Sequence, residues 1–216
     1  IGVVFDSCPF PANVRVQDVA TLGKVAYPTW DQAYFAQLCA QFSLADKKKV
    51  SELSRGMGMK LSLAFALAHH PQLLILDEPT AGLDPMARED LLEMLRAYMQ
   101  DQTRAILMSS HITTDLDKLA DQVVCIDEGR IIFNVSQDEI GDMAGVAHLR
   151  ASEVDDVVAW LEARPSASPV SVLKQGYETL VLVPDRFAFS EAFPQVAVER
   201  TTIEDYMTLV LKGGAR

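Results

Sequence analysis

Short apolar runs that stop at polar side chains recur along the chain. The clearest is the run Leu-Leu-Ile-Leu at positions 73–76, which ends at the adjacent carboxylates Asp77 and Glu78 and is followed by Pro79 and Gly82. Consecutive branched aliphatic residues are typical of a parallel strand that is covered on both faces. Ligands of such sheets bind at the carboxyl ends of the strands, so the pattern predicts that Asp77 and Glu78 face a binding site.

The rest of the pattern predicts an α/β fold. Strands are expected at residues 1–6 and 105–109, and helically spaced apolar residues lie between them. Asp31 and Ser54 are the expected N-caps of two of these helices, and Gly129 suits the turn of a hairpin. The predicted helices cover residues 16–25, 30–42, 54–69, 86–100, 113–120, 154–161 and 203–212, the hairpin strands cover 123–126 and 131–133, further strands cover 170–174 and 179–183, and a loop is expected at Pro165, Ser166, Ser168 and Pro169.

Two other predicted elements also carry polar residues at one end. Residues 53–57, Leu-Ser-Arg-Gly-Met, open an apolar helix, and residues 107–111, Leu-Met-Ser-Ser-His, end a buried-looking strand at His111. Two neighbouring acids alone could simply solvate the end of a strand. Three polar ends in this order favour a functional site instead.

The stretch from Leu53 to His111 resembles the ATPase core of ATP-binding-cassette (ABC) proteins, with the signature, Walker B, D-loop and switch-histidine motifs in the family's order. The nearest look-alikes are ATPase subunits of bacterial exporters. The resemblance implies a partial nucleotide-binding domain at residues 1–146, P-loop NTPase-like, with a mostly parallel sheet and a helical subdomain at about residues 7–70. Beyond about Ala147 the pattern changes to short alternating segments, which predicts a small α+β appendage at residues 147–216.

The resemblance also implies roles for the acid pair and its neighbours. Asp77 would hold Mg²⁺, through water because this cation keeps part of its hydration shell. Glu78 would be the general base, and His111 would contact the γ-phosphate of ATP. Asp84 matches the D-loop aspartate, which communicates between paired subunits.

The signature segment departs from the family pattern at two positions. Ser54 and the free N–H groups around Gly56 begin a helix, which suits an anion, and in this family that anion is ATP bound by the opposite subunit. Arg55 replaces the usual first glycine and Met57 the usual glutamine. Arg55 could add a phosphate contact or could point to solvent.

Asp6 occupies the position where the family usually has a glutamine that reports on the site to the membrane partner. An ionised carboxylate accepts hydrogen bonds but cannot donate them. Asp6 could still bind Mg²⁺ through water, and its role in coupling stays open.

A phosphate-binding loop of the form Gly-x-x-x-x-Gly-Lys-[Ser/Thr], which the family should carry, does not occur in the 216 residues. We expect a truncated sequence rather than a natural protein that lost this loop. The 216 residues alone are accordingly expected to bind ATP weakly.

Composition limits the possible partners. A formal net charge of −11 disfavours non-specific binding of nucleic acid. No stretch of about 18 apolar residues occurs, so no span of a bilayer is predicted. The three cysteines lack metal-ligand spacing and fit reduced thiols of a cytoplasmic protein. The histidines other than His111, which are His69, His70 and His148, are expected to be structural.

These expectations predict an ATP-hydrolysing subunit of a bacterial ABC exporter that works with an integral membrane permease. The subunit would bind ATP and Mg²⁺, pair head-to-tail with a second ATPase subunit, and lie in the cytoplasm on the inner face of the cell membrane. Whether the pair is a homodimer or a heterodimer, and which substrate is carried, stay open. Two alternatives remain: a soluble ATPase of the same fold that acts on ribosomes or DNA, and a non-catalytic regulatory relic whose C-terminal appendage binds a protein or small ligand.

Overall fold

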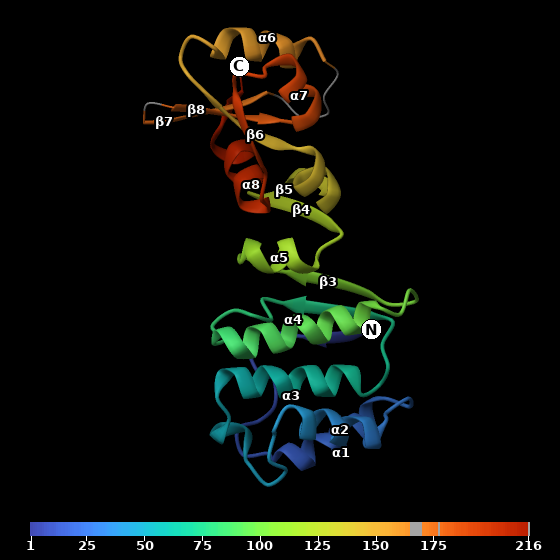
Figure 1. Ribbon diagram of the computed structural model, residues 1–216. Coiled ribbons are helices and arrows are strands. Elements are labelled where there is room, and N and C mark those ends of the chain that lie inside the picture. Colours follow the sequence, from blue (N-terminus) through green and yellow to red (C-terminus); the bar gives the residue numbers. More distant parts are fainter. Residues whose placement is uncertain (165–169, 177, 216) are drawn as a thin grey trace. The chain divides into compact units, whose positions relative to one another are not determined.

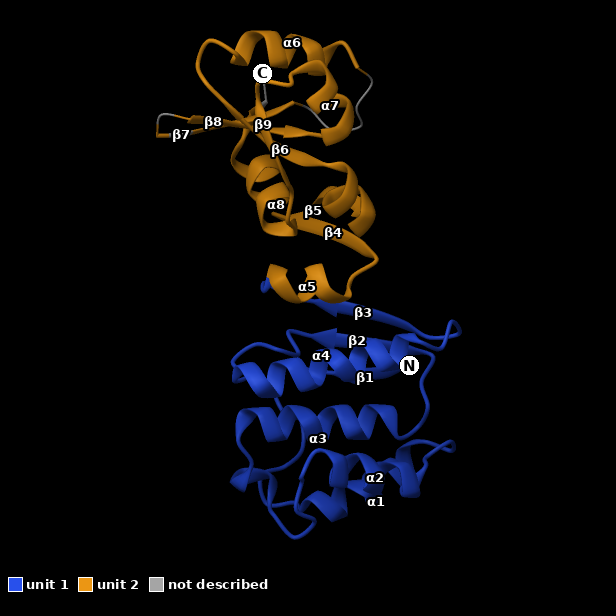
Figure 2. Ribbon diagram, in the orientation of Figure 1, with its two compact units in different colours: residues 1–112 blue, residues 113–216 orange. Residues whose placement is uncertain are grey.

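The computed structural model describes residues 1–164, 170–176 and 178–215. The predicted loop at Pro165, Ser166, Ser168 and Pro169 lies outside the described residues. The chain divides into two compact units, residues 1–112 and residues 113–216 (Figure 2). The expected domain boundary near Ala147 stays a prediction.

The first unit is built on a three-stranded parallel sheet (Figure 1). Its strands are β1 (Gly2–Val4), β2 (Leu73–Asp77) and β3 (Ala105–Ser109), and β2 lies in the middle. Residues that pair across it include Leu76 with Met108 and Asp77 with Ser109. The predicted parallel arrangement is confirmed, and the ends of β2 and β3 coincide at Asp77 and Ser109.

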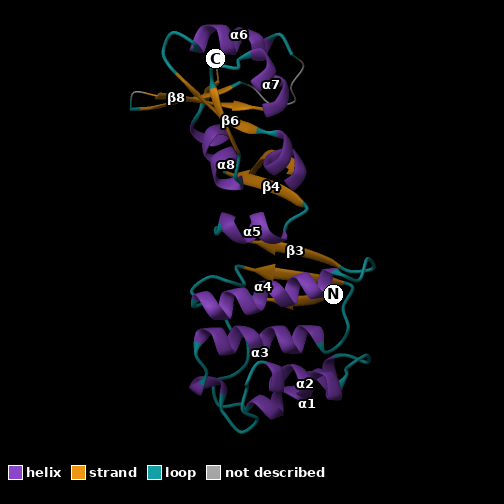
Figure 3. Cartoon of the chain, in the orientation of Figure 1, coloured by secondary structure: helices purple, strands orange, loops and turns teal. Residues whose placement is uncertain are grey.

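Four helices complete this unit: α1 (Val16–Ala26), α2 (Gln32–Gln41), α3 (Arg55–Leu67) and α4 (Pro85–Met99) (Figure 3). A short 3-10 turn, Val50–Glu52, precedes α3. Asp31 caps α2, as expected, because its carboxylate accepts a hydrogen bond from the amide of Tyr34 at 2.9 Å. That bond is the largest cause of the lowered pKa of Asp31.

The expectation that β2 is covered on both faces is wrong for the described residues. Leu74 and Leu76 on one face of β2 are buried, whereas Ile75 on the other face is only half-buried. Its neighbour Leu107 on β3 is 63% exposed. In a strand alternate side chains point to opposite faces, and the described residues leave the face of Ile75 and Leu107 largely open.

His69 lies buried at the end of the α3 segment, as expected for a structural histidine. Its ring stacks on that of Tyr27 with centroids 3.9 Å apart. Among the described residues its Nε2 atom has no hydrogen-bond partner. Burial lowers the pKa of His69, because removal from water disfavours the charged imidazolium.

The second unit begins with helix α5 (Thr113–Leu119) and the hairpin of β4 (Gln122–Asp127) and β5 (Arg130–Ser136). The predicted hairpin is confirmed, and Gly129 has a φ of 75° in its turn. A π-helical turn, Glu139–Met143, leads into a five-stranded antiparallel sheet. The later elements are β6 (Gly145–Leu149), α6 (Val154–Glu162), β7 (Ser171–Gln175), β8 (Glu178–Val183), α7 (Arg186–Ala192), β9 (Ala197–Arg200), α8 (Ile203–Lys212) and β10 (Gly214–Ala215).

The segment from β6 to β9 has the ferredoxin-like arrangement. Its elements follow the order strand, helix, strand, strand, helix, strand, and β9, β6, β8 and β7 lie side by side in that order. On one face of the sheet, Ala147 and Val181 form a hydrophobic core with Phe189 of α7. On the other face, Val146 and Leu182 form a second core with residues of α8. The sheet is therefore covered on both faces. The pattern predicted neither β6, β9 nor α7.

Replacement of Phe189 by Ala should destabilise the second unit. Phe189 is fully buried and its ring lies 5.8 Å from that of Trp160. Removal of a buried phenylalanine side chain costs about 3–5 kcal/mol through lost burial and the cavity left behind. Urea unfolding followed by Trp fluorescence measures the loss. Phe187 is the control in the same helix, because it is 58% exposed and its replacement by Ala should cost less than about 0.5 kcal/mol; equal losses would contradict the assigned core.

Acidification should destabilise the protein through His69. An unfolded histidine takes up a proton as pH falls through about 6.5, whereas the lowered pKa of His69 keeps the folded form neutral. Stability should therefore be unaffected by this group above that pH and should decrease below it. His69→Phe keeps the stacked ring and removes the titration. The urea midpoint should fall less between pH 7 and pH 5.5 in His69→Phe than in the parent; equal falls would exclude His69 as the cause.

Candidate functional site

The carboxyl ends of β2 and β3 bring the predicted acid pair together with a serine. Asp77 is the last residue of β2 and pairs in register with Ser109, the last residue of β3. The hydroxyl of Ser109 donates a hydrogen bond to Oδ1 of Asp77 at 2.6 Å. Both residues are exposed. The carboxylate is thus held in place and remains accessible to a ligand.

Glu78 follows in an unusual backbone conformation. Its φ is 46°, in the left-handed region that non-glycine residues rarely adopt. Its amide donates to the carbonyl oxygen of Ser109 at 3.2 Å and to the Ser109 hydroxyl at 3.1 Å. Such strained residues gather at functional sites, where the surrounding contacts fix them.

His111 lies against Glu78. Its Nδ1 is 2.7 Å from Oε2 of Glu78. A carboxylate only accepts hydrogen bonds, so Nδ1 of the ring carries the proton in this contact. The two residues are 33 positions apart in the sequence, and the parallel pairing of β2 with β3 brings them together. The other ring nitrogen belongs to a side chain that is 71% exposed and is available to a ligand.

The segment after Glu78 turns sharply into α4. Gly82 has a φ of 71°, and Asp84 is the N-cap of α4. Oδ1 of Asp84 accepts hydrogen bonds from the amides of Met86 and Ala87 at 3.1 and 3.0 Å. The predicted D-loop aspartate therefore holds the start of a helix.

The signature segment begins α3 beside this turn. Oγ of Ser54 accepts a hydrogen bond from the amide of Met57 at 3.2 Å, which confirms Ser54 as the N-cap. A Cβ atom placed on Gly56 would lie 3.4 Å from the Leu83 side chain. One placed on Gly82 would lie 3.1 Å from Nη1 of Arg55. The Arg55 guanidinium therefore packs on the Gly82 turn, so the signature segment and the D-loop are in contact within one chain.

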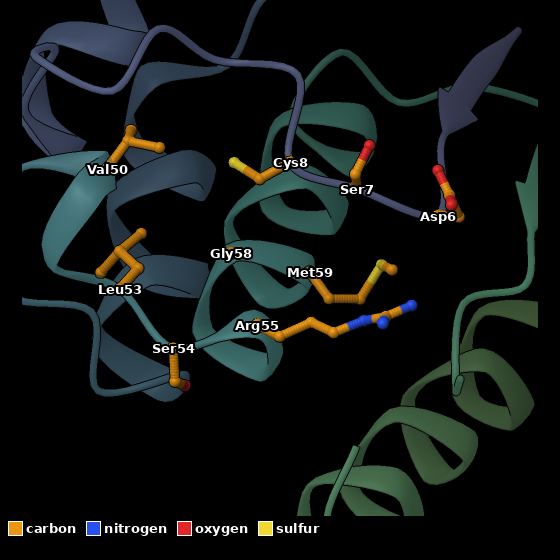
Figure 4. A pocket seen from close by; sticks show the side chains of 9 residues that line it. All are labelled: Asp6, Ser7, Cys8, Val50, Leu53, Ser54, Arg55, Gly58 and Met59. Carbon is orange, nitrogen blue, oxygen red and sulfur yellow. The ribbon is translucent and has the colours of Figure 1, made fainter. Parts of the chain in front are cut away.

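Asp6 lies on the wall of a cavity of about 270 Å³ that also includes the start of α3. Figure 4 shows Arg55 and Met59 extending side by side toward the segment that carries Asp6. Cys8 approaches α3 closely, since a Cβ on Gly58 would lie 3.1 Å from its Cβ. The lining residues are Asp6, Ser7, Cys8, Val50, Leu53, Ser54, Arg55, Gly58 and Met59.

The donor set fits a hydrated divalent cation. Asp77 offers a carboxylate oxygen, the ligand type that Mg²⁺ prefers. Among the described residues, the Asp77 carboxylate has one hydrogen bond, which Oδ1 accepts from Ser109. Within the same residues, no three His, Cys, Asp or Glu side chains lie together so that they could hold a metal ion alone. One carboxylate is enough where phosphates and water supply the other ligands, as Mg²⁺ sites commonly do.

Comparison with known proteins relates the first part of the chain to a family. The family model described as ABC transporter matches residues 1–81. These residues belong to an ABC transporter ATPase domain. It is 33% identical over 141 residues to the uncharacterized ABC transporter ATP-binding protein YxlF of Bacillus subtilis, a match that covers 65% of this chain and 47% of that protein. The predicted resemblance is confirmed.

Relatives with named cargo match the ABC domain over shorter stretches. The bacitracin transport ATP-binding protein BcrA of Bacillus licheniformis is 38% identical over 94 residues, covering 44% of this chain and 31% of that protein. The lantibiotic transport ATP-binding protein SrtF of Streptococcus pyogenes is 41% identical over 93 residues, covering 43% and 40%. The chain thus spans less than half the length of these curated relatives.

A solved structure confirms the ABC fold. The ATP-binding subunit of an ABC transporter superposes with a TM-score of 0.55 at 26% identity, covering 64% of this chain and 60% of that one. The predicted α/β class with a parallel sheet and helices is confirmed.

Two contacts of the ABC site were not foreseen from the sequence. Ser109 was assigned no role, although its place two residues before His111 at a strand end was a usable signal. The packing of Arg55 on Gly82 had no local signal, because the two residues are far apart in the sequence. Arg55 was expected either to add a phosphate contact or to point to solvent. In the structure it packs on the D-loop turn and lines the cavity wall, and it is still exposed.

Replacement of Gly82 by Ala should destabilise the ABC domain by about 1–2 kcal/mol, the cost of a left-handed conformation for a residue with a Cβ. The Arg55 guanidinium would add crowding. A double-mutant cycle separates the backbone cost from this crowding. Urea unfolding is measured for the parent, Arg55→Ala, Gly82→Ala and the double variant. The Gly82→Ala loss should be smaller in the Arg55→Ala background, and a loss below about 0.5 kcal/mol in the parent would contradict the assigned turn.

Proposed function

We propose that the protein hydrolyses ATP to drive export through a separate membrane subunit. The observation that carries this proposal is the contact of His111 with Glu78 beside Asp77 at one sheet edge. A general base must be oriented, and an ion-binding carboxylate must lie next to it, for water to attack a phosphoryl group. Family membership supports the same reaction.

Each residue has a distinct part in this reaction. Asp77 would hold Mg²⁺, which on binding neutralises phosphate charge. Glu78 accepts the proton of the attacking water. His111 holds Glu78 through Nδ1 and directs its exposed ring toward the γ-phosphate. This arrangement puts a proton acceptor and a hydrogen-bonding ring on the same side of the nucleotide.

The signature segment is proposed to bind the nucleotide of a paired subunit. The first amides of α3 carry partial positive charge, and Ser54 is exposed at this end. A helix N-terminus of this kind binds phosphate. Head-to-tail pairing, in which each subunit supplies one half of two sites, follows from this placement.

The membrane partner is proposed to contact the cavity between the Asp6 segment and α3. The cavity combines an acid, a cation and apolar residues, which suits a short amphipathic segment.

None of the helices among the described residues has the length and apolar character of a membrane span. We place the protein on the inner face of the cell membrane. Cargo selection would belong to the partner, as the bacitracin and lantibiotic relatives carry different named cargoes.

Replacement of Glu78 by Gln should lower ATP hydrolysis by about 100-fold or more while ATP binding persists. The change removes the proton acceptor and keeps the size of the side chain, and general base catalysis contributes about 10²–10⁴-fold. Steady-state phosphate release and nucleotide binding are measured on the protein as its gene encodes it, purified from membranes.

Glu128→Gln is the matched control. Glu128 is also a glutamate with positive φ, 44° against 46° for Glu78, and it lies in the β4–β5 turn. Its replacement should leave hydrolysis within about twofold of the parent, since surface changes rarely matter. Unchanged hydrolysis in Glu78→Gln would remove Glu78 from its role. Co-purification of ribosomes or DNA instead of a polytopic protein would refute the transport assignment.

A further inference from the structure

The Ser109 hydroxyl makes two hydrogen bonds, one to each member of the acid pair. It donates to Oδ1 of Asp77 at 2.6 Å and accepts from the amide of Glu78 at 3.1 Å. A serine hydroxyl has one proton to donate and lone pairs to accept. Its single donor is therefore committed to Asp77, and Ser109 is not free to donate to a phosphate.

These bonds cross between two strands. Ser109 ends β3 and Asp77 ends β2, and the two residues pair in register. A side chain at this position reaches the neighbouring strand end directly, as cross-strand partners do. The bond from Ser109 thereby restricts the rotation of the Asp77 carboxylate.

The same hydroxyl supports the strained backbone of Glu78. The amide of Glu78 has two acceptors, the Ser109 carbonyl oxygen at 3.2 Å and the hydroxyl at 3.1 Å. A left-handed glutamate persists only where its surroundings over-determine it. The Ser109 hydroxyl is one of these determinants, and the orientation of the Glu78 side chain toward His111 depends on that backbone.

We infer that Ser109 is a positioning residue for the reaction, which sets the Asp77 carboxylate and the Glu78 backbone at the same time. The inference rests on the proposed ATP hydrolysis for its kinetic consequence. Its structural consequence, protection of the Glu78 amide, is independent of hydrolysis. The neighbouring Ser110 does not share this role, because its Oγ accepts from the amide of Ile112 at 3.0 Å.

The test compares Ser109→Ala, Ser109→Thr and Ser110→Ala in the protein as its gene encodes it. Amide hydrogen exchange is measured by NMR. Loss of one acceptor should speed exchange of the Glu78 amide about three- to tenfold in Ser109→Ala, the effect of one net hydrogen bond. Ser109→Thr keeps the hydroxyl and should match the parent. In Ser110→Ala the Ile112 amide should exchange faster instead, with Glu78 unchanged.

Hydrolysis gives the second readout. In Ser109→Ala, kcat should fall about tenfold or more with KM for ATP within about twofold, because a misplaced acid pair weakens the transition state rather than ground-state binding. Ser109→Thr should recover most of kcat. The inference would be overturned if the Glu78 amide exchanged in Ser109→Ala at the parental rate. It would also be overturned if Ser109→Ala kept the parental kcat while Glu78→Gln was inactive. Equal loss of kcat in Ser109→Thr and Ser109→Ala would also overturn it.

Failure of the proposed function would give a different experimental result. If Glu78→Gln retains hydrolysis, the assignment of Glu78 fails. The exchange pattern of the three serine variants would still decide whether Ser109 positions the acid pair.

Discussion

The candidate site depends on the parallel pairing of β2 with β3. This pairing aligns Asp77 with Ser109 and places the two residues that follow these strands, Glu78 and His111, within hydrogen-bonding distance. A shift of one residue would turn every side chain of a strand to the other face. Because Leu74 and Leu76 must remain buried, such a shift is strongly disfavoured. The burial of the apolar face thus fixes the geometry of the polar edge.

The polar edge in turn uses backbone strain. A positive φ at Glu78 allows the chain to leave the strand abruptly, so that Asp77 and Glu78 take different surroundings although they are adjacent. Asp77 lies against a neutral hydroxyl, and Glu78 lies against a ring nitrogen. Two adjacent carboxylates at one strand end thereby have separate hydrogen-bond partners. Environment rather than residue type distinguishes them.

The parts of this protein that could be predicted from the sequence are those with local signals. Apolar runs ending at polar residues identified β2, β3 and the residues at their ends, and the caps Asp31 and Ser54 followed from side-chain chemistry. The packing of Arg55 on Gly82 could not be predicted, because it depends on the path of a turn between distant segments. The ferredoxin-like order of the second unit was also not predicted. Its strand β6 pairs with β8 and β9, and pairing between distant short strands leaves little trace in a single sequence.

The sequence also led to the wrong expectation that the face of β2 that carries Ile75 is covered. A continuous apolar run shows that both faces of a strand suit burial, but it does not show which element covers them.

Helix capping engages the side chains of Ser54 and Asp84 in different ways. Oδ1 of Asp84 accepts two amide hydrogen bonds, so this aspartate fixes the turn before α4. Ser54 differs, because its oxygen accepts from the amide of Met57 while its hydroxyl proton remains to be donated. Capping therefore leaves Ser54 a hydroxyl donor beside amides that also attract an anion. The Arg55 side chain, held against Gly82, links this donor to the turn that Asp84 holds. The signature segment and the D-loop are thus in direct contact within one chain.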